Sequence, residues 1–405
     1  MSKLETRTIL LTSLFNIASS LVSSFVSVYL FVYADSLVIM ALYTIIRISL
    51  FPPFFIIGSK IAKKMPFTVT FAIGLCLITC SLAYALTATR LFEMNKYFVL
   101  IAAFITGIGE GFYYFSSNTC VQIVSTPETR ARFFSYFGTF GNISNFIAPF
   151  IATFIISSAH NDMLGYRRIL YLTVCIYIVV VCIAITLHKK SDDRDVKLSE
   201  CFKLTDEKWR GHQIGVFFYG LHNSLSLILI NLIVFKAAGT GGSYSKLQTF
   251  FALFTALSYF LVTRRLDRKN INGIFNVGVI LKSSATIVLV LLNNVYGAIY
   301  YGVVNALAQA FYDNSYNYLS ACAIGRFPEE MTARVVARET VLSISRCIGM
   351  AFIILCSKLM SEDIYLKVSV ITLSLAPIVV NRILLKYKWY TLVVNGGFVW
   401  KRSLF

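Results

Sequence analysis

The sequence has 405 residues, of which 57% are hydrophobic and only 14% are charged, and its formal net charge is +18. A soluble globular domain carries roughly 25% charged residues, so this chain lacks the polar groups needed to cover a water-facing surface. These values argue against a soluble enzyme and predict a protein embedded in lipid. The first apolar run, 9–33, is also too long for a cleavable signal peptide.

A helix needs about 20 apolar residues to cross the hydrocarbon core of a bilayer. Read on that basis, the chain contains twelve apolar spans separated by short polar loops. In chain order the predicted spans are 8–33, 36–59, 67–89, 97–124, 133–158, 169–187, 213–235, 247–262, 271–292, 295–324, 335–358 and 364–385. Prolines within two of these spans, Pro52-Pro53 and Pro149, predict kinks because proline removes a helical hydrogen bond.

The longest polar loop, 189–211, falls between the sixth and seventh spans. It predicts two six-helix bundles, 1–188 and 212–388, followed by a tail at 389–405. Most of the 37 Lys and Arg residues lie at the two termini, in this linker and in the loops after even-numbered spans. By the positive-inside rule, both termini therefore face the cytoplasm. The positive charge reflects membrane topology and not nucleic-acid binding.

An internal repeat supports this division into halves. The segments 107–138 and 305–343 align over most of their length, with Phe112-Tyr113 over Phe311-Tyr312, Asn118 over Asn317, Pro127-Glu128 over Pro328-Glu329, and Ala131-Arg132 over Ala333-Arg334. A repeat of this length in corresponding halves of an apolar chain is typical of a duplicated membrane bundle. The predicted fold is an all-α membrane protein with twelve transmembrane helices in two six-helix pseudo-repeat bundles around a central cavity.

The loops between spans carry motifs of a known family. The loop after the eighth span reads TRRLDRK, and its counterpart after the second span reads GSKIAKK, which keeps the glycine and the bases but lacks the acid. With the six-plus-six arrangement, these motifs resemble the major facilitator superfamily over residues 8–385. The resemblance implies alternating-access secondary transport and a set of gating-loop residues: Asp267, Arg268, Arg130, Arg132 and Arg334. Gly138, Gly141 and Pro149 match part of the glycine–proline signature of the family's exporters.

Glu110 is the first of two acids inside apolar spans, where ionisable groups are costly and usually functional. It shares one face of the fourth span with Tyr113, Tyr114 and Ser117. A carboxyl group in a low dielectric is readily protonated, so Glu110 is a candidate proton carrier or substrate contact. The alternative is that Glu110 pairs with an arginine and only ties two helices together.

Asp313, in the tenth span, is the second such acid and stands four residues from both Gln309 and Asn317. This spacing predicts a polar stripe along one face of an α-helix. The repeat aligns Glu110 with Gln309 and Tyr114 with Asp313, so the two acids lie about one helical turn apart. We expect a proton step on one side of the site and a substrate contact on the other.

Four basic or titratable side chains also fall within spans. Arg47 in the second span and Arg346 in the eleventh are candidates for substrate binding or proton coupling. Lys282 lies in the ninth span, which in the family lies on the outside of the bundle, so its ammonium group is expected to reach the headgroups. His222 in the seventh span fits either a proton relay or a helix–helix hydrogen bond.

Five aromatic side chains adjoin these polar positions: Tyr113, Tyr114, Phe311, Tyr312 and Tyr316. An aromatic-lined cavity with few charges suits an amphipathic or partly cationic organic substrate. No nucleotide-binding or hydrolase motif is present, so a gradient must supply the energy. Cys76 and Cys80 have helical spacing, but no His or acid stands beside them, so neither a metal site nor a cofactor is expected.

The sequence therefore predicts a monomeric transporter of the plasma (inner) membrane that binds a small molecule and protons. The favoured function is proton-coupled efflux of a small amphipathic or antibiotic-like compound, including peptide-derived ones. The first alternative is proton-coupled uptake of an anionic metabolite, with Arg47 and Arg346 binding the anionic group. The second is a non-transporting receptor or assembly factor.

Overall fold

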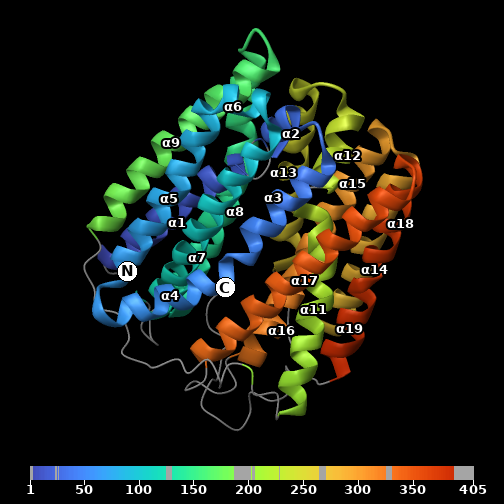
Figure 1. The fold of residues 1–405 in the computed structure, drawn as a ribbon. Helices are drawn as coiled ribbons and strands as arrows, with labels where there is room; N and C mark the ends of the chain where they lie inside the picture. The colour runs from blue at the N-terminus through green and yellow to red at the C-terminus, as the bar shows by residue number, and fades with distance from the viewer. Residues whose placement is uncertain are drawn as a thin grey trace.

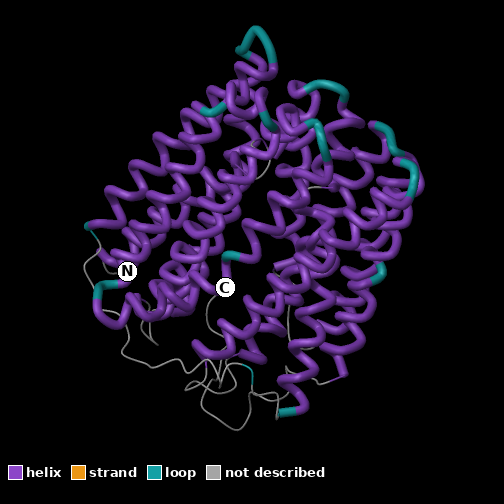
Figure 2. Tube along the Cα trace, in the orientation of Figure 1, coloured by secondary structure: helices purple, strands orange, loops and turns teal. Residues whose placement is uncertain are grey.

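The computed structural model describes residues 3–22, 25, 27–124, 130–186, 202, 206–227, 229–263, 271–324 and 331–386. Nearly all of these residues are helical, and none lies in a strand (Figure 2). A bilayer offers no hydrogen-bond partner to the backbone, so a spanning segment must satisfy its own N–H and C=O groups. The long apolar runs of this sequence meet that requirement as helices.

The first six predicted spans are helical in the residues that the structure describes. Their elements are α1 (Lys3–Leu21) and α2 (Ser27–Ala34), α3 (Leu37–Ser49) and α4 (Phe51–Lys64), α5 (Phe67–Thr87) and α6 (Thr89–Met94), the 3₁₀ turn η2 (Lys96–Phe98) and α7 (Val99–Val124), α8 (Arg130–Ser157), and α9 (Asp162–Ile185). The second span breaks where α3 meets α4, directly before Pro52-Pro53. By contrast, α8 continues through Pro149.

The last six predicted spans are also helical. Their elements are α11 (Glu207–Leu227) and α12 (Leu229–Ala238), α13 (Gly241–Thr263), α14 (Ile271–Leu292), α15 (Val295–Ala308) with the π-helical turn η3 (Gln309–Asp313) and α16 (Asn314–Ile324), α17 (Met331–Leu359), and α18 (Glu362–Ser374) with α19 (Ala376–Lys386). Eight stretches of the described chain are long and apolar enough to cross a membrane by themselves. The predicted all-α membrane fold is confirmed.

The helices form two groups, a first group α1–α9 and a second group α11–α19 (Figure 1). The groups meet where α3 packs against α17 and where α8 packs against α13. At the first junction the Cys347 Sγ lies 3.8 Å from the carbonyl oxygen of Ile45. At the second, the hydroxyls of Thr153 and Thr249 are 2.7 Å apart. Residues 187–201 and 203–205 lie outside the described chain, so the domain boundaries at 188 and 211 stay a prediction.

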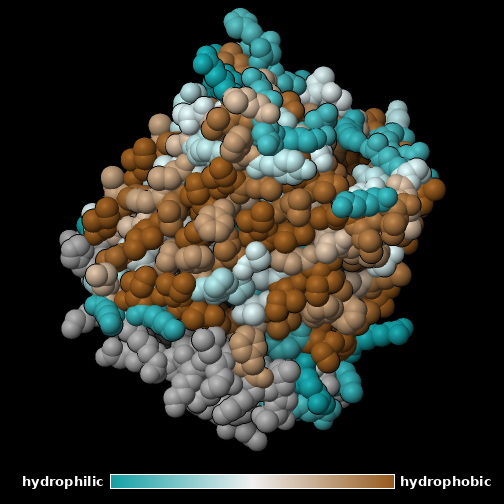
Figure 3. All heavy atoms as spheres, in the orientation of Figure 1, coloured by the Kyte–Doolittle hydropathy of each residue, from teal (hydrophilic) through white to brown (hydrophobic). Residues whose placement is uncertain are grey.

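The surface has the polarity expected of a protein in a bilayer. On the face shown in Figure 3, apolar side chains form a broad band around the middle, and hydrophilic side chains gather at the two ends. Large apolar side chains such as Phe154 and Ile280 are exposed, at 74% and 69%. Exposed apolar surface on this scale needs a partner, and the lipid tails provide it.

The same close helix contact occurs once in each group. A Cβ atom added to Gly74 on α5 would lie 2.6 Å from the backbone nitrogen of Tyr113 on α7. A Cβ atom added to Gly278 on α14 would lie 2.6 Å from the backbone nitrogen of Tyr312 on η3. Only glycine allows two backbones to approach this closely. The equivalent contacts support the predicted pseudo-repeat and its alignment of Tyr113 with Tyr312.

A phenylalanine three residues before each glycine completes the motif. The ring of Phe71 lies 5.0 Å from that of Tyr113, and the ring of Phe275 lies 5.2 Å from that of Tyr312. The sequence F-x-x-G in the third helix of each half therefore docks against a tyrosine in the fourth. This contact fixes how α14 faces η3, and with it the direction of the next residues along α14.

Replacing Gly278 should test this close contact. In the Gly278→Ala variant the added Cβ must push α14 away from η3, and overpacking of this kind costs about 1–3 kcal/mol. The expected result is a lower midpoint of thermal unfolding for the purified protein in detergent. Gly273→Ala on the same helix is the matched control, because no atom lies within 4 Å of its added Cβ. Equal midpoints for the two variants would contradict the contact.

Candidate functional site

Arg47 and Glu110 form a buried ion pair in the first group of helices. The Arg47 Nε donates to Glu110 Oε2 at 2.7 Å, and Nη2 donates to Oε1 at 2.6 Å. Gly107 permits this geometry, because a Cβ there would lie 2.5 Å from the carbonyl oxygen of Arg47. The parallel bonds are the strong, bidentate form of an arginine–carboxylate pair. Glu110 is therefore bound to α3 by an arginine, as in the helix-tying alternative.

Asp313 forms the second buried pair, in the second group of helices. The Lys282 Nζ lies 3.0 Å from Asp313 Oδ2 and 3.3 Å from the Asn305 side-chain oxygen. The Tyr219 hydroxyl donates to Asp313 Oδ1 at a longer 3.4 Å. Side chains of α14 and α11 thus contact this carboxylate of η3, and Asn305 of α15 contacts Lys282.

The expected position of Lys282 near the headgroups is wrong. Its side chain is only 9% exposed and points from α14 toward η3 and α15. The physical reason is the backbone contact at Gly278, one helical turn earlier, which turns this face of α14 inward. In the repeat, the counterpart of Lys282 is Ile78, four residues after Gly74, so the first group has no equivalent cation there.

The expected stripe of Gln309, Asp313 and Asn317 on a regular α-helix is also wrong. Residues Gln309–Asp313 form the π-helical turn η3, whose i→i+5 hydrogen bonds shift the register of the following α16. Gln309 lines a cavity, whereas Asn317 is exposed on α16. A π-helical turn inside an α-helix frequently marks a functional site, and this one presents Asp313 to Lys282.

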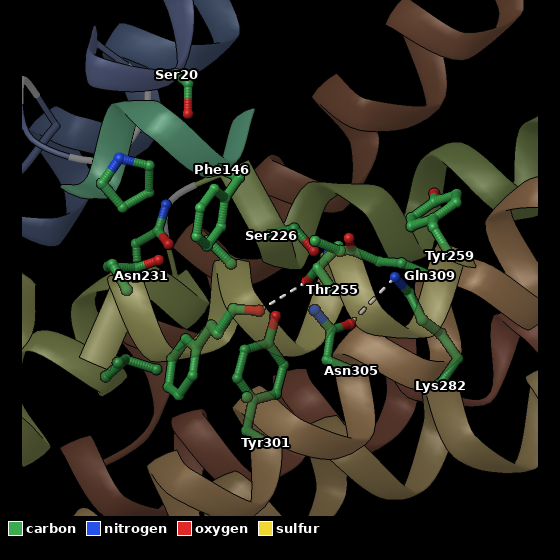
Figure 4. A pocket seen from close by; sticks show the side chains of 17 residues that line it. Ser20, Phe146, Ser226, Asn231, Thr255, Tyr259, Lys282, Tyr301, Asn305 and Gln309 are labelled. Atoms are coloured by element: carbon green, nitrogen blue, oxygen red, sulfur yellow. Dashed lines mark hydrogen bonds between the residues drawn. The ribbon is translucent and has the colours of Figure 1, made fainter. Parts of the chain in front are cut away.

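A cavity of about 360 Å³ lies beside the Lys282–Asp313 pair. The second group supplies most of its lining, and the first group contributes Ser20, Phe146 and Pro149. In Figure 4 the side chains of Lys282, Asn305 and Gln309 gather along one side, with Tyr259 and Tyr301 nearby. Amide, hydroxyl and ammonium groups that line a pocket together with apolar side chains can fix the orientation of a polar organic molecule.

The two tyrosines predicted in the fourth span have different environments. Tyr113 is 2% exposed and stacks on Phe15 with ring centroids 3.5 Å apart, so it belongs to the core of the first group. Tyr114 is partly exposed, and its ring lies 5.2 Å from that of Phe51. Tyr114 also lies within electrostatic range of Arg346 on α17, across the junction of the two groups.

His222 is buried between α11 and α18. Its Nδ1 lies 3.2 Å from the carbonyl oxygen of Leu373, while Nε2 has no hydrogen-bond partner among the described residues. This contact matches the helix–helix hydrogen bond that was one of its two predicted roles. The relay role stays a prediction, with the positive charge of Lys282 within electrostatic range.

The gating-loop residues are only partly described. Asp267 and Arg268 lie outside the described residues, and so do the side chains of Arg130 and Arg132. Arg334 lies in the first turn of α17, not in a loop, and is 6% exposed. Its Nη1 donates to the carbonyl oxygen of Ala323 at 3.1 Å, and its guanidinium lies 4.7 Å from the ring centre of Trp209. It joins the start of α17 to α16 and α11.

Comparisons with known proteins agree with this architecture. The chain is 25% identical over 373 residues to the uncharacterized protein YqgE of Bacillus subtilis (strain 168), covering 89% of this chain and 84% of that protein. A second relative, described as an uncharacterized protein in the sodM 3' region of Geobacillus stearothermophilus, is 28% identical over 141 residues, which are 35% of this chain and 64% of that protein.

Solved structures share the fold at low sequence identity. A POT family transporter in complex with a thioalcohol-conjugated peptide has a TM-score of 0.71 at 11% identity, with 95% of each chain covered. The nucleoside transporter NupG has a TM-score of 0.68 at 12% identity, covering 95% of this chain and 99% of that one. The fucose:proton symporter FucP of E. coli has a TM-score of 0.59 at 16% identity, covering 95% and 97%.

The family itself is shown by a sequence profile. The profile of the Major Facilitator Superfamily matches residues 9–354, which is most of the chain. Together with the twelve helical spans and the two groups of helices, this match decides the class of the protein. The chain belongs to the Major Facilitator Superfamily and is an integral, multi-pass membrane transporter, not an enzyme.

Proposed function

We propose that this protein is a proton-coupled secondary transporter and that it exports a small amphipathic compound. The observation that carries the proposal is the Lys282–Asp313 pair in the wall of the second group, beside the polar cavity. This carboxylate lies next to the cavity and can exchange its cation for a proton. Such an exchange would link proton binding to substrate binding. Membership in a transporter family favours transport over the receptor or assembly-factor alternative.

The two ion pairs differ in what they can do with a proton. The guanidinium of Arg47 stays protonated in proteins and grips Glu110 with two parallel bonds. Lys282 has a single bond to Asp313, and an ammonium group is a compact charge on a flexible stem that can move away from its partner. Asp313 can therefore be neutralised either by Lys282 or by a proton from the cavity. We assign proton coupling to this pair and helix positioning to Arg47–Glu110.

Topology and location follow from the distribution of charge. We propose that the ends of α4, α9, α16 and α19 face the cytoplasm of a cell whose plasma (inner) membrane holds the protein. Figure 1 shows α4, α16 and α19 at one end of the bundle and α2, α6 and α12 at the other. The positive-inside rule assigns the lysine- and arginine-rich end to the cytoplasm. One chain supplies both groups of helices, so a monomer suffices for transport.

One observation bears on the direction of transport, and another bears on the charge of the substrate. Export is favoured by Gly141 and Pro149 in α8, which match part of the exporter signature in the fifth span. The second candidate is proton-coupled uptake of an anionic metabolite, and the observation in its favour is Arg346, which has no carboxylate partner among the described residues. The solved structures of NupG and FucP share the fold only, so they do not decide between the two.

Neutralising the Lys282–Asp313 pair should abolish coupling. In Asp313→Asn, position 313 can no longer take up a proton. We expect inserted protein with transport at the level of empty membranes, measured with any compound whose cellular accumulation the wild-type protein changes. Lys236→Gln is the matched control, because Lys236 and its partner Glu362 are 54% and 59% exposed and neither lines the cavity. Full activity of Asp313→Asn would remove the carboxylate from the mechanism.

Breaking the Arg47–Glu110 pair should instead destabilise the fold. Removing one partner of a buried pair costs about 3–5 kcal/mol, and the 29% exposure of Arg47 places the loss near the lower end of this range. Glu110→Gln should therefore lower the unfolding midpoint, and the double variant Arg47→Gln, Glu110→Gln should recover part of the loss. If Glu110→Gln unfolds like the wild type, the pair does not hold α3 to α7.

The direction of transport is measured by accumulation in cells. An exporter lowers the cellular content of its substrate on expression, and an importer raises it, in both cases only with a proton gradient present. We expect lowered accumulation of an amphipathic compound, abolished by a protonophore. Raised accumulation of an organic anion would replace export by the uptake alternative. The Asp313→Asn variant serves as the inactive control for both outcomes.

A further inference from the structure

Arg346, in the middle of α17, is a half-buried cation, and no acid of the described chain forms an ion pair with it. Its Nε is buried without a hydrogen-bond partner, and no carboxylate of the described chain lies within salt-bridge distance of it. The other charges of the core are already matched. Glu110 holds Arg47, Asp313 holds Lys282, and Arg338 on the same helix pairs with Glu339.

A second unpartnered donor lies in the same region. The hydroxyl of Tyr316 on α16 is buried, in a residue that is only 3% exposed, and it makes no hydrogen bond. The ring of Tyr316 stacks on that of Tyr219 in α11. At this level α11 packs against α17, since a Cβ added to Gly220 would clash with the Ser345 Oγ. The Sγ of the next residue but one, Cys347, lies 3.8 Å from the carbonyl oxygen of Ile45 in the first group. Arg346 therefore lies at the junction of the two groups, level with the stacked tyrosines.

Leaving the Arg346 and Tyr316 donors without acceptors costs free energy unless a ligand binds them. A guanidinium whose Nε is buried without an acceptor and a buried hydroxyl without an acceptor each destabilise the folded protein. Both unmatched groups are donors, so the missing partner is an acceptor, and the excess charge is positive. A ligand with an anionic group supplies both at once. The same reasoning disfavours the partly cationic substrate suggested by the sequence, because each described acid in the middle of the bundle already holds a cation.

We infer that Arg346 and the Tyr316 hydroxyl form a subsite for the anionic group of the substrate, a carboxylate or a phosphate. This inference rests on the proposed function, in which an organic substrate passes between the two groups of helices. The rings of Tyr219 and Tyr316 are parallel, with centroids 3.7 Å apart and an interplanar angle of 3°, and they make a rigid aromatic wall beside the subsite. Such a wall suits an apolar or aromatic body attached to the anion.

The first test needs no substrate. If Arg346 is an unmatched charge, replacing it by methionine removes an unfavourable group, and the Tm of purified Arg346→Met is unchanged or raised by about 2 °C. Tyr316→Phe likewise leaves the Tm unchanged, because the lost hydroxyl has no partner. Arg47→Met is the matched control and lowers the Tm, because it leaves Glu110 unpaired. A fall in the Tm of Arg346→Met comparable to that of Arg47→Met overturns the inference.

The second test uses three probes of similar size on the full chain in detergent: phenylacetate, phenyl phosphate and the neutral phenylacetamide. The subsite predicts that at least one anionic probe raises the Tm of the wild-type protein, that phenylacetamide does not, and that Arg346→Met loses the shift. The anionic probe that gives the larger shift in Tm shows whether the subsite prefers a carboxylate or a phosphate. No shift with either anion, an equal shift with the amide, or a shift that persists in Arg346→Met overturns the inference.

These readouts separate the subsite from the transport mechanism. Asp313→Asn is expected to keep the probe-induced shift in Tm while losing coupled transport. If Asp313→Asn transports normally, proton coupling at Lys282–Asp313 is wrong and the anion subsite still stands. If the probe shifts fail while Asp313→Asn loses transport, the subsite is wrong and the coupling assignment stands.

Discussion

A carboxylate in the interior of a membrane protein remains charged only when a cation is held against it, and this constraint organises the core of the molecule. Each described acid in the middle of the bundle is in contact with a base: Glu110 with Arg47, Asp313 with Lys282, and Glu339 with Arg338. Two of these contacts join different helices. The pairs therefore position helices as well as charges, and any proton or substrate that enters must compete with one of them.

The pairs differ in strength and setting, and this difference gives the two groups of helices different roles. The first group has a bidentate contact between α3 and α7, beside a cavity of only about 30 Å³. The second group has a single lysine contact, a π-helical turn and a cavity of about 360 Å³. A tight pair in a closed environment acts as a fixed support. A weaker pair next to a cavity is the one that can change partners during a transport cycle.

Much of the fold could be predicted from the sequence, because hydropathy over about 20 residues depends on composition alone. The predicted spans agree closely with the helices, and the repeat placed Tyr113 opposite Tyr312. The direction of a side chain around its helix is harder to predict, as Lys282 shows. That direction depends on the contact between Gly278 and the backbone of Tyr312, which joins distant parts of the chain. Aligning the F-x-x-G motifs of the two halves would have placed Lys282 on the inner face of α14, at the position equivalent to Ile78 in the first half.

The register change at η3 had no signal of this kind. Gln309, Asp313 and Asn317 have regular helical spacing, and nothing in their identity indicates an i→i+5 turn. The pairing of Glu110 with Arg47 was one of two interpretations, and the spacing of residues along one helix does not reveal a partner on another. The environment of Arg346 depends on the packing of α17 against α11 and α3, so it is defined only when the helices are assembled.

The paired glycine contacts also bear on how such a protein arises and diverges. Gly74 with Tyr113 and Gly278 with Tyr312 have the same geometry, yet the residues one turn further on, Ile78 and Lys282, differ completely in chemistry. After a duplication, the backbone contact acts as a shared scaffold, and the neighbouring side chains are free to specialise. One half can then keep a purely structural role while the other acquires charged residues, and the helix packing of both halves stays the same.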